Sequence, residues 1–348
     1  MPFPASSLTL LPASATLRFL KSRQQGPGRY LEAREDEPTL EALRWAAEIT
    51  AILSGELVTP APFIDDCRRP GGTFAMTAAD PEPSRAASYY AVRALTLSSR
   101  RHDIPGELAA WCVGELAAPG LPATSDIDEM FYVLRALEQQ GALGLLAPAV
   151  SASLVDFIQD CRHSDGGYAG VPGLPSDTEH TYCAVCSLSL LGHPLGTADS
   201  RVTAEWLRSR FTTPSGLATL SAADDTPSLA ASYWSFRAGE VLDSTVWTDR
   251  LGPAVDGLGK PDGGYGARPY ATLWESYCAL RVVSTLPTGS SRWLGLDLPH
   301  RLEKLTAVPV RHVVSRPPPP EVPAGPPPAQ PQRMGGVLTA LGALITKR

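Results

Sequence analysis

The sequence predicts an all-α fold, an (α/α)6 toroid in which six helix pairs form one barrel-like ring. Three observations lead to it. A unit of helix, Gly/Pro loop and second helix recurs six times along most of the chain. Hydrophobic residues make up 43% of the 348 residues, enough to bury a continuous core between stacked units. Such units can extend as a solenoid or close into a ring, and long glycine-containing loops such as 164–177 favour closure.

Two similar stretches, FIDDCR at 63–68 and FIQDCR at 157–162, mark the repeat. Each is followed by a glycine turn and then by an apolar helical stretch that contains aromatic residues. The second helices align as one weaker and five clear copies, at 41–53, 86–95, 128–137, 179–188, 230–239 and 274–283, and a helix at 17–24 opens the first unit. Because each unit has an apolar stripe that a neighbour can cover, we expect a toroid over residues 10–295. The second helix of each pair should lie on the inside and the first on the outside.

The C-terminal part of the chain differs in kind. Residues 296–333 are predicted to be a Pro-rich flexible linker, because SRPPPPEVPAGPPPAQPQR from Ser315 suits an extended spacer and not a helix. Residues 334–348 place apolar side chains on one helical face and predict a short amphipathic helix, too short to span a bilayer. Such a tail suits docking to a protein partner or a membrane surface, or is a disordered remnant.

Composition narrows the function. Thirty basic against thirty-six acidic residues give a net charge of −6, which argues against a nucleic-acid partner. No uninterrupted apolar run reaches about 18 residues, so no spanning helix is expected. The first basic residue is Arg18, and Pro4 and Pro12 interrupt the apolar start, so we expect no secretory signal. Six cysteines in so long a chain suit reduced thiols rather than a disulfide scaffold, so the expected location is cytoplasmic. If the C-terminal tail docks, the protein would be peripheral to a membrane or an assembly.

Three carboxylates open the inner helix of the third unit: Asp126, Asp128 and Glu129. Acidic residues at a helix N-terminus are favoured by capping and by the helix dipole, which is one explanation. Three within four residues are more than capping requires. Like charges so close raise the pKa of one member, which keeps a proton available to a general acid.

The segments at 165–192 (DGGYAGVPGLPSDTEHTYCAVCSLSLLG) and 262–280 (DGGYGARPYATLWESYCAL) resemble the prenyltransferase and squalene-cyclase repeat superfamily. Within it, DIDEMFYVLRALEQQG at 126–141 resembles the DxDD helix of class II terpene cyclases. There the middle Asp protonates a terminal alkene or epoxide and starts cyclisation. The resemblance implies that Asp128 is the acid and Asp126 its flanking carboxylate, while Glu129 stands where that family has Asp.

The implied activity is cyclisation of a linear isoprenoid diphosphate, a sesqui- or diterpenyl diphosphate rather than squalene, because the chain has length for one toroid and the squalene enzymes use two. Mg²⁺ would arrive with the diphosphate, since the sequence has no dedicated ligand motif for it.

His180 begins the next inner helix, one residue after the position that matches Asp128. Neighbouring packed helices lie about 8–10 Å apart, so we expect His180 to hydrogen-bond and polarise the acid pair. The alternative is a histidine that faces solvent. Cys183 and Cys186 follow on the same helix and, with His180, could be metal ligands. Spacings of three and six residues spread the three side chains around the helix, so the cysteines are expected to pack as small apolar residues instead.

Aromatic residues recur three and four positions after the one that matches Asp128, and a tryptophan occupies that position itself in the last unit. If this face lines a central cavity, their rings would stabilise carbocations, whereas ordinary interhelix packing is the alternative. They are Tyr89, Tyr90, Phe131, Tyr132, Tyr182, Tyr233, Trp234, Trp274 and Tyr277.

Arginine recurs seven positions after the same point, at Arg93, Arg135, Arg237 and Arg281. Seven residues are close to two helical turns, so each arginine shares a face with the opening residue. Buried arginines need partners. These are either a substrate diphosphate, bound bidentately, or structural ion pairs between helices.

Three other functions stay open. Protein prenyltransferase β subunits bind zinc through Asp, Cys and His, and the repeat places those positions near Ala230, Ser232 and Glu275, which predicts no zinc site and argues against protein prenylation. A non-catalytic isoprenoid- or peptide-binding protein and a structural scaffold are the other two.

Overall fold

The computed structural model of the chain describes residues 13–33, 37–53, 60–118, 126–212 and 214–286. The chain divides into two compact units, Met1–Val308 and Pro309–Arg348, and all described residues belong to the first. The predicted linker (296–333) and terminal helix (334–348) lie outside the described residues.

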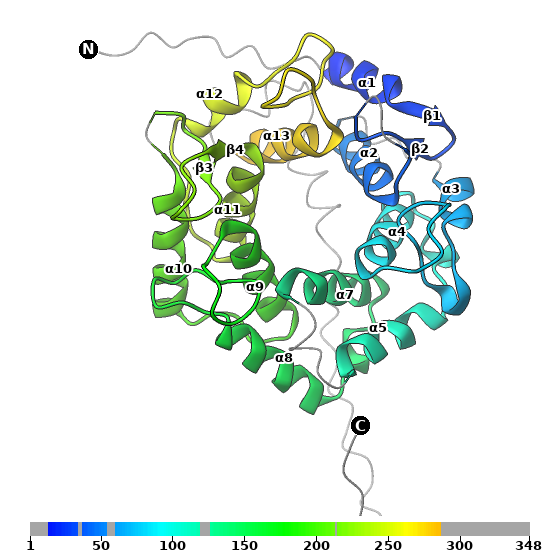
Figure 1. Ribbon diagram of the computed structural model, residues 1–348, viewed down its shortest axis with the longest axis horizontal. Helices are drawn as coiled ribbons and strands as arrows, with labels where there is room; N and C mark the ends of the chain where they lie inside the picture. Colours follow the sequence, from blue (N-terminus) through cyan, green and yellow to red (C-terminus); the bar gives the residue numbers. More distant parts are fainter. Residues whose placement is uncertain (1–12, 34–36, 54–59, 119–125, 213, 287–348) are drawn as a thin grey trace, which may run out of the picture. The chain divides into compact units, whose positions relative to one another are not determined.

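Twelve α-helices of the described residues form two concentric rings (Figure 1). The inner ring consists of α2 (Leu40–Leu53), α4 (Arg85–Leu97), α7 (Ile127–Gln140), α9 (Thr178–Leu190), α11 (Leu229–Val241) and α13 (Leu273–Thr285). The outer ring consists of α1 (Ala13–Ser22), α3 (Ala61–Asp66), α5 (Glu107–Ala117), α8 (Pro148–Asp160), α10 (Thr197–Arg210) and α12 (Leu251–Asp256). Each inner helix contacts the next, and α13 contacts α2. The predicted all-α toroid is therefore confirmed, with the second helix of each pair on the inside.

Every inner helix begins at a side chain that caps it. The oxygen of a Ser, Thr or Asp accepts a hydrogen bond from the backbone N–H three residues later, which satisfies one of the free donors of the first turn. The six caps are Thr39, Ser84, Asp126, Asp177, Ser228 and Thr272. The helix starts are therefore encoded locally, in residues that can be read from the sequence.

A second repeated contact attaches the glycine loops to the inner helices. A Ser or Thr hydroxyl in the first turn accepts the backbone N–H of the loop in four of the units. The pairs are Phe74 with Ser88, Tyr168 with Thr181, Ala218 with Ser232, and Tyr265 with Ser276, at 2.8–3.3 Å. Short elements complete the loops: β1 (Gln24–Gly26) pairs with β2 (Arg29–Tyr30), and β3 (Ala218–Thr219) with β4 (Pro227–Ser228).

The glycine of the Asp-Gly-Gly turns is required by both conformation and space. Gly166 and Gly263 have φ of 96° and 97°, a region that L side chains rarely adopt. A Cβ on Gly166 would lie 2.7 Å from the Val202 side chain, and one on Gly263 would lie 2.2 Å from the Ala15 carbonyl oxygen. These loops therefore sit directly on helices of the outer ring.

Aromatic side chains link all six inner helices. Their ring centroids are 4.8–6.4 Å apart in one closed series of contacts, Trp45–Tyr90, Tyr89–Tyr132, Phe131–Tyr182, Tyr182–Tyr233, Tyr233–Tyr277 and Tyr277–Trp45. We call these residues the aromatic belt. Because residues of equivalent positions meet, the inner helices run in the same direction and in the same register. In the described part of the chain, no helix is long and apolar enough to cross a membrane.

Candidate active site

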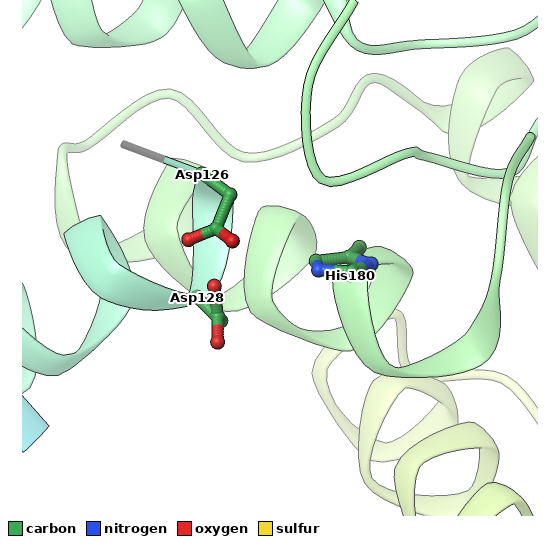
Figure 2. Close-up of side chains that lie close together, drawn as sticks. All are labelled: Asp126, Asp128 and His180. Carbon is green, nitrogen blue, oxygen red and sulfur yellow. The ribbon is translucent and has the colours of Figure 1, made fainter. Parts of the chain in front are cut away.

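Two carboxylates meet at the N-terminus of α7. Asp126 is the cap residue, and its Oδ1 accepts the backbone N–H of Glu129 at 3.3 Å. Asp128 lies in the first turn, and the carboxyl groups of the two residues point toward each other (Figure 2). Both side chains are half-buried.

The loop of the next unit completes the site. The Gly170 carbonyl accepts the backbone N–H of Ile127 at 3.0 Å, so this loop caps α7 from outside. The missing side chain of Gly170 leaves room for His180 at the start of α9, because a Cβ there would lie 2.7 Å from the His180 Nε2. Potential ligand atoms of Asp126, Asp128 and His180 lie within 4.8 Å of one another (Figure 2). The structure thus places His180 beside the acid pair and not in open solvent.

The electrostatics separate the two carboxyl groups. Burial raises the pKa of Asp128 to about 7, and its hydrogen bond with Asp126 and the negative charge there add to the effect. Burial also acts on Asp126, but hydrogen bonds from Asp128 and from the Glu129 backbone outweigh it and lower the pKa of Asp126. Near neutral pH the pair therefore shares one proton, carried by Asp128 and directed at the Asp126 carboxylate.

The surroundings of His180 favour its cationic form. Burial lowers the pKa of this imidazole, but the hydrogen bond and the charge of Asp177, followed by the charge of Asp128, outweigh burial and raise its pKa. The positive charge in turn favours the carboxylate form of Asp128. A cationic His180 therefore stabilises the anionic form of Asp128.

Glu129, the third carboxylate of the predicted cluster, is directed elsewhere. Its Oε2 lies 3.6 Å from a guanidinium nitrogen of Arg85, which also binds Glu115 at 2.8 Å. With 41% of its side chain exposed, Glu129 belongs to a surface ion-pair network at the helix start. Glu129 therefore contacts Arg85 and not the carboxyl pair, because neighbouring residues of a helix are rotated by about 100° from each other, and its catalytic role stays a prediction.

An aromatic cavity of about 240 Å³ lies one turn further along the inner helices. Phe131 and Tyr132 line it from α7, three and four residues after Asp128, so Asp128 is on the helix face that borders this cavity. Asp126, Asp128 and His180 are not themselves among its lining residues. The other side chains that line it are Glu41, Arg44, Trp45, Tyr90, Glu179, Tyr182, Cys183, Tyr233, Trp234 and Trp274.

A second space, the arginine cavity, has a volume of about 130 Å³ and lies toward the C-terminal halves of the same helices. All four predicted arginines line it, and Tyr89 and Tyr277 are added to the aromatic wall. Every predicted aromatic residue thus borders one cavity or both.

Three of the four arginines make ion pairs. Arg93 binds Glu48 through Nε at 2.7 Å and through a second nitrogen at 3.2 Å. Arg135 binds Glu138 at 2.5 Å, and Arg237 binds Glu240. Burial opposes the charge of Glu48, but Arg93 outweighs it and lowers the pKa of Glu48 to about 2. Only the Arg93 pair joins two helices, α4 and α2, as the structural alternative requires; the pairs of Arg135 and Arg237 lie within one helix, three residues apart. Arg281 has no carboxylate within ion-pair distance among the described residues.

Four residues of the site were not predicted to belong to it. Arg44 and Glu48 occupy, on α2, the positions that carry an aromatic residue and an arginine on other inner helices. Glu179 matches Asp128 by position and lines the aromatic cavity, and burial raises its pKa to about 7. Asp177 precedes His180 by three residues, the spacing of a helix cap. The repeat alignment contains a signal for Arg44 and Glu48, which depart from the common residue at their positions, and for Glu179, which is acidic where Asp128 is. Asp177 is marked by the spacing of a helix cap, as Asp126 is.

Arg44 separates the two cavities and lines both. Its guanidinium carbon lies 3.8 Å from the ring centroid of Trp45 and 4.9 and 5.1 Å from those of Tyr89 and Tyr90. The residue is 8% exposed. Cation–π contacts thus hold a permanent positive charge between the two cavities.

The positions predicted to correspond to a zinc site do not suit zinc. Ala230 offers no ligand atom, and the Ser232 hydroxyl binds the loop N–H of Ala218 at 2.8 Å. The Glu275 carboxylate accepts the Ala267 N–H at 2.9 Å and the Thr272 hydroxyl at 3.3 Å. Cys183 and Cys186 are free thiols that pack among apolar side chains.

Comparisons with known proteins agree with this architecture. The family model described as "Prenyltransferase alpha-alpha toroid domain" matches residues 5–118 and 125–218. A sequence comparison with curated proteins gives no match. Candida albicans protein geranylgeranyltransferase-I complexed with GGPP aligns with a TM-score of 0.63 and 15% identity, over 83% of this chain and 99% of that chain. This likeness shows a shared fold.

Two structures of the type II terpene cyclase MstE from Scytonema, in complex with geranylgeranyl dihydroxybenzoate, align less well. Their TM-scores are 0.46 and 0.47 at 13% and 12% identity. The alignments cover 73% of this chain and 80% and 79% of those chains.

Proposed function

Since this chain belongs to the prenyltransferase alpha-alpha toroid domain family, we propose that it catalyses protonation-initiated cyclisation of a linear isoprenoid diphosphate. The single observation that carries the proposal is the pair of facing carboxyl groups of Asp126 and Asp128, on the face of α7 that borders an aromatic-lined cavity. An acid with a pKa of about 7 keeps its proton below that pH and is about half protonated at pH 7, and it can release the proton to an alkene when the product cation is stabilised.

The proposed first step is proton transfer from Asp128 to a terminal alkene of the substrate. A new C–H bond forms at one alkene carbon, and the positive charge appears at the other. The next alkene attacks this carbon, which closes a ring and moves the charge along the chain. Asp128 is left as a carboxylate, stabilised by the His180 cation, and the loss of a proton from the final cation ends the reaction.

Aromatic side chains are suited to stabilise the intermediate cations. A ring face attracts a cation by about 0.5–2 kcal/mol, more when both are desolvated. Phe131, Tyr132, Tyr182, Trp234 and Trp274 line the aromatic cavity, which is the nearer of the two cavities to the acid along α7. The charge of Arg44 repels a carbocation, so cyclisation is expected away from Arg44, near the Phe131 and Tyr132 rings on the helix that carries the acid.

Asp126 and His180 act as positioning residues in this mechanism. The Asp126 carboxylate accepts the hydrogen bond of the Asp128 hydroxyl, which orients the acid. The three side chains Asp126, Asp128 and His180 are also types that bind divalent cations, but the proton shared by the carboxyl pair competes for the same place. Mg²⁺ would arrive with the diphosphate of the substrate and neutralise its charge, and no step requires it at the acid pair.

Turnover with defined substrates tests the proposal. Farnesyl and geranylgeranyl diphosphate are each incubated with the full chain and Mg²⁺, and the products are dephosphorylated and compared by mass spectrometry. We expect an isomer of the substrate that has fewer double bonds and one or more rings. The Asp128→Asn variant should lose at least about 100-fold in rate, whereas Glu129→Gln, a matched change one residue away, should stay within about threefold.

Two outcomes would reject a cyclase. Unchanged substrate with every isoprenoid tested would favour a binding protein without chemistry. Prenyl transfer to a cysteine peptide, together with stoichiometric zinc in the purified protein, would favour a protein prenyltransferase subunit.

A further inference from the structure

The arginine cavity contains more positive charge than its carboxylates balance. Five guanidinium groups line it, those of Arg44, Arg93, Arg135, Arg237 and Arg281. Three carboxylates, those of Glu48, Glu138 and Glu240, form ion pairs with them. An excess of two positive charges therefore remains within the described residues.

The unbalanced charges belong to Arg44 and Arg281. Neither has a carboxylate within ion-pair distance in the described ranges, and the two residues are only 8% and 6% exposed. The Arg44 guanidinium is held by aromatic rings instead, and its Nε is buried with no hydrogen-bond acceptor in that part of the chain. Both charges lie close enough to Glu48 to lower its pKa, so they are gathered at one wall of the cavity.

Such an arrangement is costly without an anion. A buried charge with no partner costs several kcal/mol, and a fold retains it only where something compensates. The cavity volume of about 130 Å³ is roughly tenfold larger than the 10–15 Å³ that a single water occupies by a similar measure, so it admits a polyatomic ligand. Planar guanidinium groups with free N–H donors match phosphate oxygens in charge and geometry.

The position of the cavity indicates what the rest of the ligand is. Arg44, Tyr182 and Tyr233 line both cavities, so the anion site adjoins the aromatic cavity. Arg93, Arg135, Arg237 and Arg281 lie seven residues beyond the Asp128 level, a distance of about 10 Å along a helix. A ligand with an anionic head and an apolar chain would thus place its head at the arginines and extend its chain toward the acid.

We propose that the arginine cavity is a binding site for a phosphate-type dianion, the diphosphate head of an amphiphile whose apolar chain occupies the aromatic cavity. The identification of the chain as the isoprenoid substrate rests on the proposed function; the anion site itself does not. In the bound state Arg281 and Arg44 contact the diphosphate, and Arg93 keeps its ion pair with Glu48. The acid therefore meets the end of the chain that is remote from the diphosphate.

Isothermal titration calorimetry on the full chain tests this site. The probes are inorganic pyrophosphate, farnesyl diphosphate and farnesol. The variants are Arg281→Gln, Arg281→Lys and the matched control Arg68→Gln, an exposed arginine just after α3. We expect pyrophosphate to bind and to compete with farnesyl diphosphate, with at least about tenfold weaker binding in Arg281→Gln. Arg281→Lys should retain part of the affinity, and Arg68→Gln all of it. Arg281→Gln removes an unpaired charge, so thermal melting should show an intact fold.

Each other outcome has a defined meaning. The proposal is overturned if pyrophosphate does not bind, or if it binds wild type and Arg281→Gln equally. Equal affinity for pyrophosphate and farnesyl diphosphate would overturn the identification of the ligand as an amphiphile, since its apolar chain would then contribute nothing to binding. Binding of pyrophosphate without any cyclised product would support the anion site and reject the cyclase. Cyclisation of farnesol without pyrophosphate binding would support the cyclase and reject the anion site.

Discussion

Asp177 holds His180 at two points. Its Oδ1 accepts the backbone N–H of His180 at 2.9 Å, and its Oδ2 lies 2.6 Å from the His180 Nδ1. One carboxylate thus caps helix α9 and orients the imidazole whose charge acts on Asp128. Because a cap residue is held by the helix it begins, the position of the histidine is coupled to the fold of the ring.

The rate of cyclisation should depend on pH through Asp128. The group acts in its protonated form, so activity should be level below its pKa of about 7 and fall about tenfold per pH unit above it. In His180→Gln the loss of a positive charge raises the pKa of Asp128, so the falling limb should move to higher pH while the maximal rate drops. The measurement is kcat/KM from pH 5 to 9, and an unshifted limb in His180→Gln would contradict the assigned coupling.

Glu179 offers an alternative source of the proton. It lines the aromatic cavity directly, and burial raises its pKa to about 7. With Asp128 as the acid, Glu179→Gln should keep its rate within about threefold at pH 6, because Gln resembles the neutral Glu that it replaces. Rates of Glu179→Gln and Asp128→Asn are compared under identical conditions. A loss of 100-fold or more in the first and little in the second would transfer the role of the acid to Glu179.

Stability should also report the state of Asp128. Its pKa in the folded chain lies above that of the unfolded chain, so its stabilising contribution is complete below about pH 4 and is lost as the pH rises through about 7. Asp128→Asn should match wild type in unfolding free energy at pH 4. At pH 8 it should exceed wild type by about 2 kcal/mol, because solvent screens part of the effect at this half-buried side chain. Denaturant unfolding at both pH values measures this, and a pH-independent difference would argue against a shared proton.

The ion pair between Arg93 and Glu48 should be essential to the ring. Removing one partner leaves the other charge buried, so Arg93→Leu should destabilise the chain by about 3 kcal/mol. Arg93→Leu with Glu48→Leu should recover part of this loss. The exposed pair of Arg68 and Asp65 is the control, since Arg68→Ala should cost less than about 1 kcal/mol. Urea unfolding of the four proteins decides, and equal losses at the two sites would show that burial does not matter here.

Residues 315–348 are predicted to act in docking and not in turnover. A chain truncated after residue 314 should keep kcat and KM with farnesyl diphosphate, and it should differ from the full chain in co-sedimentation with vesicles or in partner recovery. A Pro-rich spacer followed by an apolar helical face would account for that difference. Identical distribution of the two proteins would reject docking.

Local sequence signals predicted much of the ring. The recurrence of an apolar helical face every 42 to 51 residues or so indicates helix pairs, and Ser, Thr or Asp at each inner helix start is a cap that acts within three residues. The Gly-Gly turns predict loops, because glycine adopts the positive φ of these turns more easily than other residues do. The position of Asp128 relative to Phe131 also follows from helical spacing alone.

Other features depended on contacts between units. Glu129 binds Arg85 of the preceding unit, and Arg93 binds Glu48 of another helix, and the repeat alignment could pair neither in advance. The pairs of Arg135 with Glu138 and of Arg237 with Glu240 are three residues apart on one helix, a spacing that the sequence does show. The approach of His180 to Asp126 depends on Gly170, a residue from a loop whose path only packing determines.

By itself, the sequence determined that this protein is a ring of helix pairs with an acid at the start of one inner helix, because caps, turns and apolar periodicity act over a few residues. Only the tertiary structure decided which carboxyl keeps its proton and where uncompensated arginine charge collects. Those properties depend on burial and on distances between helices that lie far apart in the chain, and Coulomb energies in a buried site change steeply with both.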